Sequence, residues 1–477
     1  MPTVSQGSSQ TLNLGPTDAY KVSVADGGEA YVDLLAGAPG SPYQSPRLRS
    51  PTDSRQFGPY GVPAVVRVRS QTGTTTYEQV GQQLALRQDA VSKKITNSLG
   101  EEVVVSGAAA SSGGPIAALR TWYQAVAGRD YAAAKIVGIG DSWMEYRTAT
   151  AFGRQWTQLL PKRLRAKYPT AGIGSGGGIG YVPIQNVSIF APYTNPWVLA
   201  GAPAQNFTSG GLGLRYNIFG AAGQTATITF TGTHAVIHYL KASSTRVGYY
   251  KVDGGAAVTF ETNNGAISDN GYVTIGPLVS GQHTLEVGWS SGGQVYIAGA
   301  AFYDGDLNAG IQFYEGGHTA FRTTDYLAVP ALDARIATIG PHLLIIALGQ
   351  NDFAQGAGLF ISAAQYKANL ETYIARLRAA GVTASILLMT SADTTLIKNA
   401  GQTSNWSDFV QAAKDIAAAD TGGPGGASGV AHIALSDSGR IPASPGVAGG
   451  LWADAAHGGD VIQSWIADIL VPPLSMA

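Results

Sequence analysis

The spacing of apolar positions changes from one segment of the chain to the next. Five short runs have the length and the Val, Ile and Leu content of strands that are buried in a parallel sheet. These runs cover residues 136–139, 311–314, 343–348, 385–389 and 430–435. Stretches with apolar residues at helical spacing lie before or between them, over 116–127, 152–164, 326–339 and 362–380. Strands that alternate with helices in this way predict an α/β domain with a doubly wound sheet.

Two other segments contain short alternating runs that are separated by Gly, Pro, Asn and Asp. In residues 1–82 the predicted strands are 20–24, 30–34 and 64–69, and in residues 190–304 they include 225–230, 248–253 and 283–287. Such segments predict all-β domains. Residues 83–113 are polar and rich in Ala, Ser and Gly, which is typical of a linker. Because residues 190–304 interrupt the α/β pattern, we expect a β-sandwich inserted between two parts of one α/β domain, 114–189 and 305–477.

Candidate chemistry begins where the first buried run ends, at Gly140, Asp141 and Ser142. Glycine lets the backbone turn tightly there. A serine at a strand-to-helix turn can be held exposed, close to backbone N–H groups that receive a developing negative charge. This position suits a nucleophile. Asp141 and Ser142 are also typical of residues that only cap the start of a helix.

Two later stretches favour the interpretation of Ser142 as a nucleophile over that of a helix cap. Asn351 and Asp352 follow the buried run 343–348, and Asp454 stands three residues before His457 near the C-terminus. A histidine side chain, with an ordinary pKa of about 6.5, can accept the serine proton and return it to a leaving group. Asp454 can accept the other imidazole N–H, which completes the logic of a serine catalytic triad.

With these residues in view, the chain resembles the SGNH (GDSL-type) hydrolases, a family of esterases and lipases. The residues that carry the resemblance are Gly-Asp-Ser at 140–142, Gly-Gln-Asn-Asp at 349–352 and Asp-Ala-Ala-His at 454–457. The resemblance extends over about 114–183 and 308–477. It implies a flavodoxin-like three-layer core, and it makes the segment 190–304 similar to the jelly-roll-like, carbohydrate-binding inserts of that family.

The resemblance also implies an oxyanion hole made of the Ser142 and Gly317 N–H groups and the side-chain amide of Asn351. Ala320 is an alternative to Gly317, because the spacing after Gly317 departs from the common pattern. Asp141 is expected to hold the serine turn, and Asp352 to orient the loop of Asn351. Together with Trp143 and His318, these two residues are also candidates for contact with the substrate. This chemistry requires no metal ion and no organic cofactor.

Composition narrows the range of partners. A chain of 477 residues is long enough for two to three domains. A net charge of −1 with only 13% charged residues argues against nucleic acid as the main partner. The sequence has no cysteine, so it has neither disulfides nor thiolate metal sites. It has no apolar run of the ~18 residues that span a bilayer.

The first residues lack the basic start and the apolar core of a signal peptide. We therefore expect a soluble protein that is extracellular or virion-associated and that leaves the cell by another route, such as lysis. Residues 1–82 loosely resemble the N-terminal part of phage tail and fibre proteins. They are interpreted as an attachment domain, with an ordinary β-domain as the alternative. Other virion tail proteins are then expected partners, and a trimer is the expected kind of oligomer.

Taken together, these patterns predict a serine esterase that removes acetyl or other acyl esters. The β-rich insert and the N-terminal segment favour a cell-surface polysaccharide as the carrier of the ester. Lipid or small acyl esters are the alternative substrates within the same class. The alternative from another class is a non-catalytic carbohydrate-binding or structural tail protein.

Several residues of the insert allow a second interpretation. Its aromatic residues suit either a β-sandwich core or stacking platforms for sugars, and they are Tyr249, Tyr250, Tyr272, Trp289 and Tyr296. The sequence 288–292 matches the Gly-x-Ser-x-Gly elbow of α/β-hydrolases, but no helix follows it, so Ser290 is not expected to react. His234 and His238 are four residues apart on a strand pattern, which does not predict a zinc site.

Overall fold

The computed structural model of the chain describes two compact units, Met1–Lys93 and Lys94–Ala477. Backbone and side chains are described for residues 118–145, 149–170, 180–184, 196–263, 271–356, 358–393, 397–420, 429–442, 451–453 and 456–475. Elsewhere only the backbone of the strands named below is described. The boundary between the units falls within the segment 83–113 that the sequence marks as a linker.

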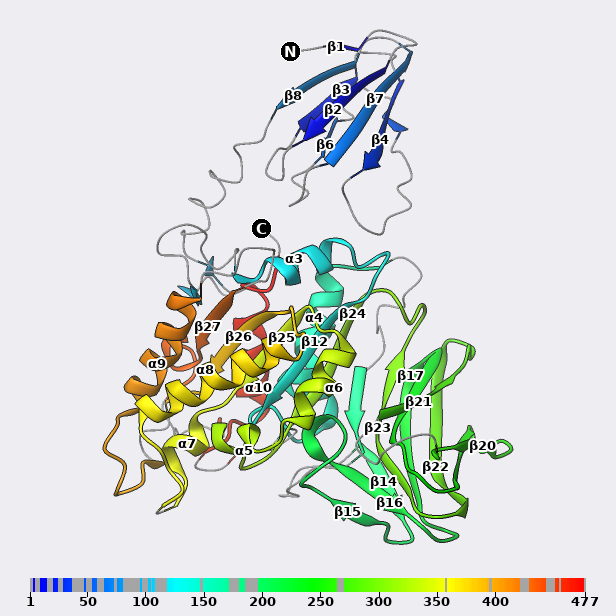
Figure 1. Cartoon of the computed structure of the whole chain (residues 1–477), viewed down its shortest axis with the longest axis vertical. Coiled ribbons are helices and arrows are strands. Elements are labelled where there is room, and N and C mark those ends of the chain that lie inside the picture. The colour runs from blue at the N-terminus through cyan, green and yellow to red at the C-terminus, as the bar shows by residue number, and fades with distance from the viewer. Residues whose placement is uncertain are drawn as a thin grey trace. The chain divides into compact units, whose positions relative to one another are not determined.

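In the described part of the first unit, eight strands form two sheets of four, and Figure 1 shows this unit in blue. One sheet has the order β1-β8-β3-β6 and the other β2-β7-β4-β5. The strands predicted at 20–24, 30–34 and 64–69 lie within β3, β4 and β7. The bounds of the eight strands are β1 (Thr3–Val4), β2 (Ser9–Leu14), β3 (Tyr20–Val24), β4 (Glu29–Ala36), β5 (Arg47–Leu48), β6 (Ser54–Phe57), β7 (Ala64–Thr72) and β8 (Thr75–Gln79).

The central sheet of the second unit has the doubly wound arrangement that the alternating pattern predicts. Five parallel strands lie side by side in the order β24-β12-β25-β26-β27. Numbered along the chain, this order is 2-1-3-4-5, which is the order of flavodoxin-like sheets. Their bounds are β12 (Ala134–Gly140), β24 (Ile311–Gly317), β25 (Leu343–Ala347), β26 (Ser385–Thr390) and β27 (Val430–Ala434).

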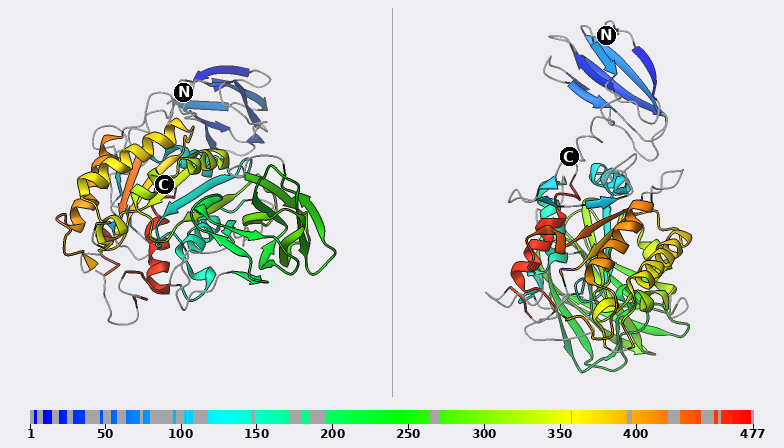
Figure 2. Two further views of the ribbon diagram at one scale, coloured as in Figure 1. Left: turned by 60° about the horizontal axis from the view of Figure 1, so that its bottom comes forward. Right: turned by 90° about the vertical axis from the view of Figure 1, so that its left-hand side faces the viewer.

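Helices cover both faces of this sheet and make three layers (Figures 1 and 2). Along β25, Leu343 and Ile345 pack into one core, whereas Leu344 and Ile346 pack into the other. Burial on both faces explains why these strands are continuously apolar. The first core is closed by α3 (Arg120–Ala127), α4 (Trp156–Lys167) and α10 (Asp460–Leu470). The second is closed by α5 (Thr323–Leu327), α6 (Ala331–Ile339), α8 (Ala363–Ala379) and α9 (Trp406–Ala419).

The segment predicted as an insert forms strands that join the central sheet. A separate five-stranded sheet has the order β14-β17-β22-β19-β20 and shares an apolar core with β16, β18 and β23. β23 pairs with β13, and β13 pairs in turn with β24, so hydrogen bonds run from the segment 190–304 into the parallel sheet. The bounds are β13 (Gly180–Pro183), β14 (Trp197–Ala200), β15 (Ala204–Asn206), β16 (Tyr216–Phe219), β17 (Thr225–Gly232), β18 (His234–Leu240), β19 (Arg246–Val252), β20 (Val258–Glu261), β21 (Asn270–Ile275), β22 (Gly281–Gly292) and β23 (Val295–Tyr303).

Three sequence predictions need correction here. The single helix predicted over 326–339 is two helices, because Pro330 between α5 and α6 has no N–H with which to continue the first. The predicted linker contains short strands, β9 (Ile95–Thr96), β10 (Glu102–Val103) and β11 (Val105–Gly107), and β11 adds an antiparallel edge strand beside β27. The helix predicted from residue 152 begins only at Trp156, after a 3₁₀ turn. In the described part of the chain, no helix is both long and apolar enough to cross a membrane.

Candidate active site

Ser142 lies in a tight turn directly after β12. The N–H groups of Met144 and Glu145 both donate to the carbonyl oxygen of Asp141 at 3.0 Å, and the Asp141 carboxylate accepts the N–H of Trp143 at 2.9 Å. Asp141 therefore holds the turn in shape. Gly140 has to be glycine, because a Cβ there would lie 2.3 Å from the carbonyl oxygen of Ala347 on β25.

The structure brings Ser142 and His457 into direct contact across 315 residues of sequence. Ser142 Oγ lies 2.6 Å from His457 Nε2, and the two residues are only 5% and 7% exposed. His457 stands in a loop that is closed by a hydrogen bond from Ala453 N–H to the His457 carbonyl oxygen, at 2.9 Å. Asp454 lies outside the described residues, so its place in the triad stays a prediction.

Gln350 connects the serine turn to the histidine loop. Its side-chain oxygen accepts the indole N–H of Trp143, and its side-chain nitrogen donates to the carbonyl oxygen of Ala456 at 3.1 Å. The Trp143 ring also meets Trp452 edge to face, with 6.0 Å between ring centroids. Sequence reasoning missed Gln350, although it occupies the variable position of the Gly-x-Asn-Asp motif.

Asn351 stands at the same edge of the sheet, in the first turn of α7 (Gln350–Ala354). β12 and β25 are neighbours with Gly140 paired to Ala347, so the segments that follow them emerge together. In a flavodoxin-like sheet this is the switch point at which ligands bind. One N–H of the Asn351 amide donates to the carbonyl oxygen of Phe321 at 3.0 Å, and an amide nitrogen carries two such hydrogens.

The second backbone donor of the predicted oxyanion hole needs correction. The N–H of Gly317 already donates to Oε1 of Glu315 at 2.5 Å, which leaves Gly317 no hydrogen to give an oxyanion. Ala320, the alternative, has a left-handed backbone with φ of +67° and is exposed. Its N–H donates to no acceptor among the described residues. A non-glycine residue in this conformation is uncommon, and such residues cluster at functional sites.

The four residues predicted to contact substrate are buried supports in this structure. Asp141 and Trp143 hold the serine turn as described above. Asp352 is buried and accepts the N–H and the hydroxyl of Thr323, and burial raises the pKa of its carboxyl to about 6. Burial lowers the pKa of His318, whose Nε2 lies 2.6 Å from the carbonyl oxygen of Phe207. Their partners within the protein explain why none of them faces solvent.

A buried cluster of charges lies behind the serine turn. Arg215 is fully buried, and its two terminal nitrogens lie 3.0 Å from Glu145 and 3.0 Å from Glu315. Glu145 ends the serine turn and also accepts the N–H of Thr319. Burial raises the pKa of Glu315 to about 7, and the neighbouring Arg215 opposes that rise. The cluster was not predicted, because nothing local in the sequence relates Arg215 to the other two.

The motifs that were rejected at the sequence level have no catalytic surroundings. Ser290 is an exposed residue on β22, within a strand and without a following helix. Burial lowers the pKa of His238 on β18 to about 3, and its ring packs against Tyr181 with 4.7 Å between centroids. In the described ranges, no group of three or more His, Cys, Asp or Glu residues is placed to hold a metal ion.

Comparisons with known proteins find distant similarities only. No protein-family model matches the chain, and no curated protein matches it. A peptidoglycan O-acetylesterase structure is 16% identical with a TM-score of 0.48, and the match covers 78% of this chain and 97% of that one. A family 2 carbohydrate esterase with a carbohydrate-binding domain, from Corynascus thermopiles (Myceliophthora fergusii), is 13% identical with a TM-score of 0.29, over 58% and 98%.

A family two carbohydrate esterase from Cellvibrio japonicus is likewise 13% identical, with a TM-score of 0.26, over 58% of this chain and 96% of that one. At these TM-scores the likenesses carry no argument about activity. The chemistry has to be inferred from the geometry around Ser142.

Proposed function

We propose that the protein is a serine esterase of the SGNH type. The observation that carries the proposal is the 2.6 Å contact between Ser142 Oγ and His457 Nε2 at the switch point of the sheet. A serine hydroxyl is a weak nucleophile unless a base stands beside it, and a histidine nitrogen at this distance is such a base. A helix cap needs no histidine on its hydroxyl, so capping alone does not account for the arrangement.

In the proposed mechanism, His457 takes the proton of Ser142 while Oγ attacks the carbonyl carbon of an ester. The resulting oxyanion accepts hydrogen bonds from the Ser142 N–H, the Asn351 amide and the Ala320 N–H. The carbon–oxygen bond of the leaving alcohol then breaks, and His457 returns the proton to that alcohol. Water, activated by the same histidine, releases the acid from Ser142. Asp454 is proposed to orient the imidazole.

The proposed substrate is an acetyl or other short acyl ester on a cell-surface polysaccharide. Ser142 and His457 are both almost buried, which favours a short acyl group over a long lipid chain. The insert offers partly exposed aromatic rings for sugar stacking, of which Tyr272 is the most open, whereas Tyr296 is buried beside Tyr216. A role as a phage tail component is proposed only from the resemblance of the N-terminal segment.

The experiment compares the wild type with Ser142→Ala on p-nitrophenyl acetate and on an acetylated polysaccharide. Ser142→Ala is expected to lower kcat by at least about 10³-fold, because the nucleophile is removed. The matched control is Ser290→Ala, which removes the serine of the rejected elbow motif and should leave kcat unchanged. Acetate release should disappear when the polysaccharide is first treated with mild base.

Two outcomes would overturn the proposal. Wild-type turnover no faster than that of Ser142→Ala would favour the non-catalytic binding protein. Loss of turnover in Ser290→Ala, with turnover kept in Ser142→Ala, would move the nucleophile into the insert.

A further inference from the structure

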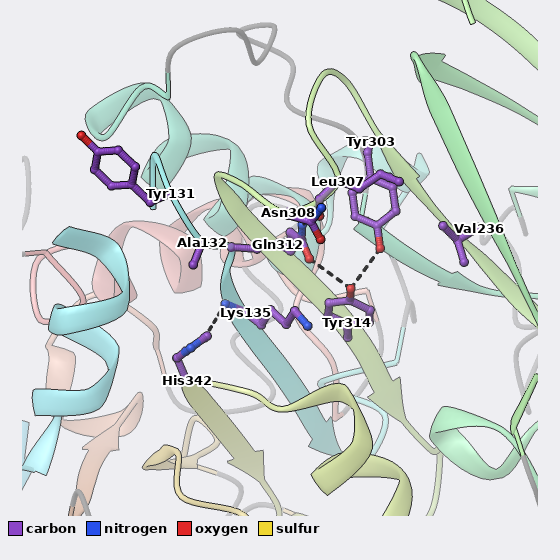
Figure 3. A pocket seen from close by; sticks show the side chains of 11 residues that line it. Tyr131, Ala132, Lys135, Val236, Tyr303, Leu307, Asn308, Gln312, Tyr314 and His342 are labelled. Atoms are coloured by element: carbon purple, nitrogen blue, oxygen red, sulfur yellow. Dashed lines mark hydrogen bonds between the residues drawn. The ribbon is translucent and has the colours of Figure 1, made fainter. Parts of the chain in front are cut away.

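A pocket lies at the end of β12 opposite to the serine turn. It has a volume of about 440 Å³, which is within the range of small-molecule sites. Lys135 and Gln312, the second residues of β12 and β24, line it, as does His342 just before β25 (Figure 3). Because β12 has seven residues at about 3.3 Å each, roughly 20 Å separates this pocket from the serine turn.

The hydrogen bonds along one wall of the pocket run in one direction. Gln312 Nε2 donates to the carbonyl oxygen of Leu307 at 2.7 Å, so the amide oxygen of Gln312 faces Tyr314. Tyr314 donates its hydroxyl hydrogen to that oxygen at 3.1 Å, and it must then accept from the Tyr303 hydroxyl, 3.0 Å away. Tyr303 has thereby used its only hydrogen. Its oxygen presents lone pairs and acts as an acceptor.

The floor of the pocket supplies donors. In Figure 3 the Lys135 side chain runs from β12 toward Tyr314. Lys135 Nζ donates one hydrogen to the carbonyl oxygen of Ile339 at 3.0 Å, and an ammonium group has three. His342 Nδ1 accepts the Lys135 backbone N–H at 3.1 Å, so a neutral His342 carries its proton on Nε2 as a further donor. Burial lowers the pKa of both Lys135 and His342.

The charge of the lining selects the class of ligand. Lys135 contributes an ammonium group, and no aspartate or glutamate is among the described residues that line the pocket. Asn308, on the rim, adds an amide. Tyr131 is also a lining residue, but its ring is 79% exposed and in Figure 3 points away from Lys135 and Tyr303. An acceptor and an ammonium group that line one pocket suit a ligand that has hydroxyls and a negative charge.

We propose that this pocket binds a carboxylate-bearing sugar, such as a uronate unit of a polysaccharide. The carboxylate contacts Lys135, and a sugar hydroxyl donates to Tyr303. That the sugar is part of a polysaccharide rests on the proposed function, whereas the binding of the sugar itself does not. The protein would then hold its polymer at a place separate from the ester that it cleaves.

The test is isothermal titration calorimetry, in which the full chain is titrated separately with D-glucuronate, D-glucose and acetate. Glucuronate should bind at least tenfold more tightly than either of the others. Glucose lacks the carboxylate that contacts Lys135, and acetate lacks the hydroxyl that donates to Tyr303. Lys135→Met should weaken glucuronate binding by 10-fold or more, the usual effect of losing a charged hydrogen bond. Tyr303→Phe, which keeps the ring, should weaken it several-fold.

Lys162→Met is the matched control, because Lys162 is an exposed lysine on α4 and should not affect binding. Equal affinity for glucose and glucuronate, affinity for acetate equal to that for glucuronate, or unchanged binding by Lys135→Met would each overturn the proposal. Ser142→Ala should bind glucuronate normally. Normal binding by a chain that hydrolyses no ester would reject the esterase and leave the sugar site standing.

Discussion

Replacing Arg215 by methionine should destabilise the protein strongly and in a pH-dependent way. The guanidinium lies between two carboxylates, 3.0 Å from each, and all three side chains are at most 2% exposed. Methionine has a similar length but no charge, so Glu145 and Glu315 would be left buried without their cation. Removing one partner of a buried ion pair typically costs about 3–5 kcal/mol. We expect this loss in the free energy of unfolding at pH 8.5.

The pH dependence follows from Glu315. Its pKa in the folded protein is about 7, raised from 4.5 chiefly by burial. A carboxyl whose pKa is raised on folding is most favourable below its unfolded pKa, and stability falls as the pH rises from 4.5 to about 7. For the wild type this fall amounts to about 3 kcal/mol. Without Arg215 the pKa rises further, so the variant continues to lose stability above pH 7, where the wild type no longer does.

The assay is urea denaturation followed by tryptophan fluorescence at pH 6.5 and pH 8.5. The control is Arg163→Met, which removes a partly exposed arginine that is 2.7 Å from Asp468. That pair should contribute no more than about 1 kcal/mol, equally at both pH values. An Arg215→Met loss that is no larger than the control, or that is the same at both pH values, would refute the reasoning. Because Glu145 ends the serine turn, kcat on p-nitrophenyl acetate should also fall, by about tenfold or more.

Three further substitutions test single contacts of the site. Asn351→Ala should lower kcat on p-nitrophenyl acetate by about 10²–10³-fold with little change in the melting temperature, because an oxyanion donor is lost; an unchanged kcat would exclude Asn351 from the oxyanion hole. Gln350→Ala should reduce kcat about tenfold, since it releases Trp143 from the histidine loop, and a kcat equal to that of the wild type would show that this connection is dispensable. Tyr326→Phe removes the hydroxyl that donates to the carbonyl oxygen of Gly140 at 2.8 Å. It should lower the free energy of unfolding, measured by urea denaturation, by about 1–3 kcal/mol. A loss below about 0.5 kcal/mol would argue that water replaces the contact.

The parts of the fold that could be predicted depend on short stretches of sequence. A buried strand such as 343–347 is recognisable from its own residues, and the polar residues that follow it mark the edge of the sheet. Ser142, Asn351 and His457 were proposed as site residues for the same reason, since each belongs to a short motif. The break between α5 and α6 could have been predicted as well, because the effect of Pro330 on a helix is equally local.

The parts that could not be predicted depend on contacts between distant residues. Gly317 was a reasonable oxyanion donor from its position after a strand, but its N–H is taken by Glu315, a residue whose orientation is set by Arg215. Nothing in the spacing of these residues along the chain encodes that geometry. The burial of Asp352 and His318 could not be predicted either. Their polar side chains were expected to contact the substrate, but each is enclosed by partners within the protein.

Arg215 also links the predicted insert to the α/β part by ion pairs. It comes from residues 190–304, yet both of its carboxylate partners belong to the α/β part, one in the serine turn and one on β24. β23 and β13 extend the same connection through backbone hydrogen bonds. Arg215 thus supplies to the α/β part a cation that contacts two buried carboxylates behind the Ser142 turn. Since two buried carboxylates without a cation cost several kcal/mol, a large part of the 5–15 kcal/mol that stabilises a typical domain, the insert and the α/β part have to fold as one unit.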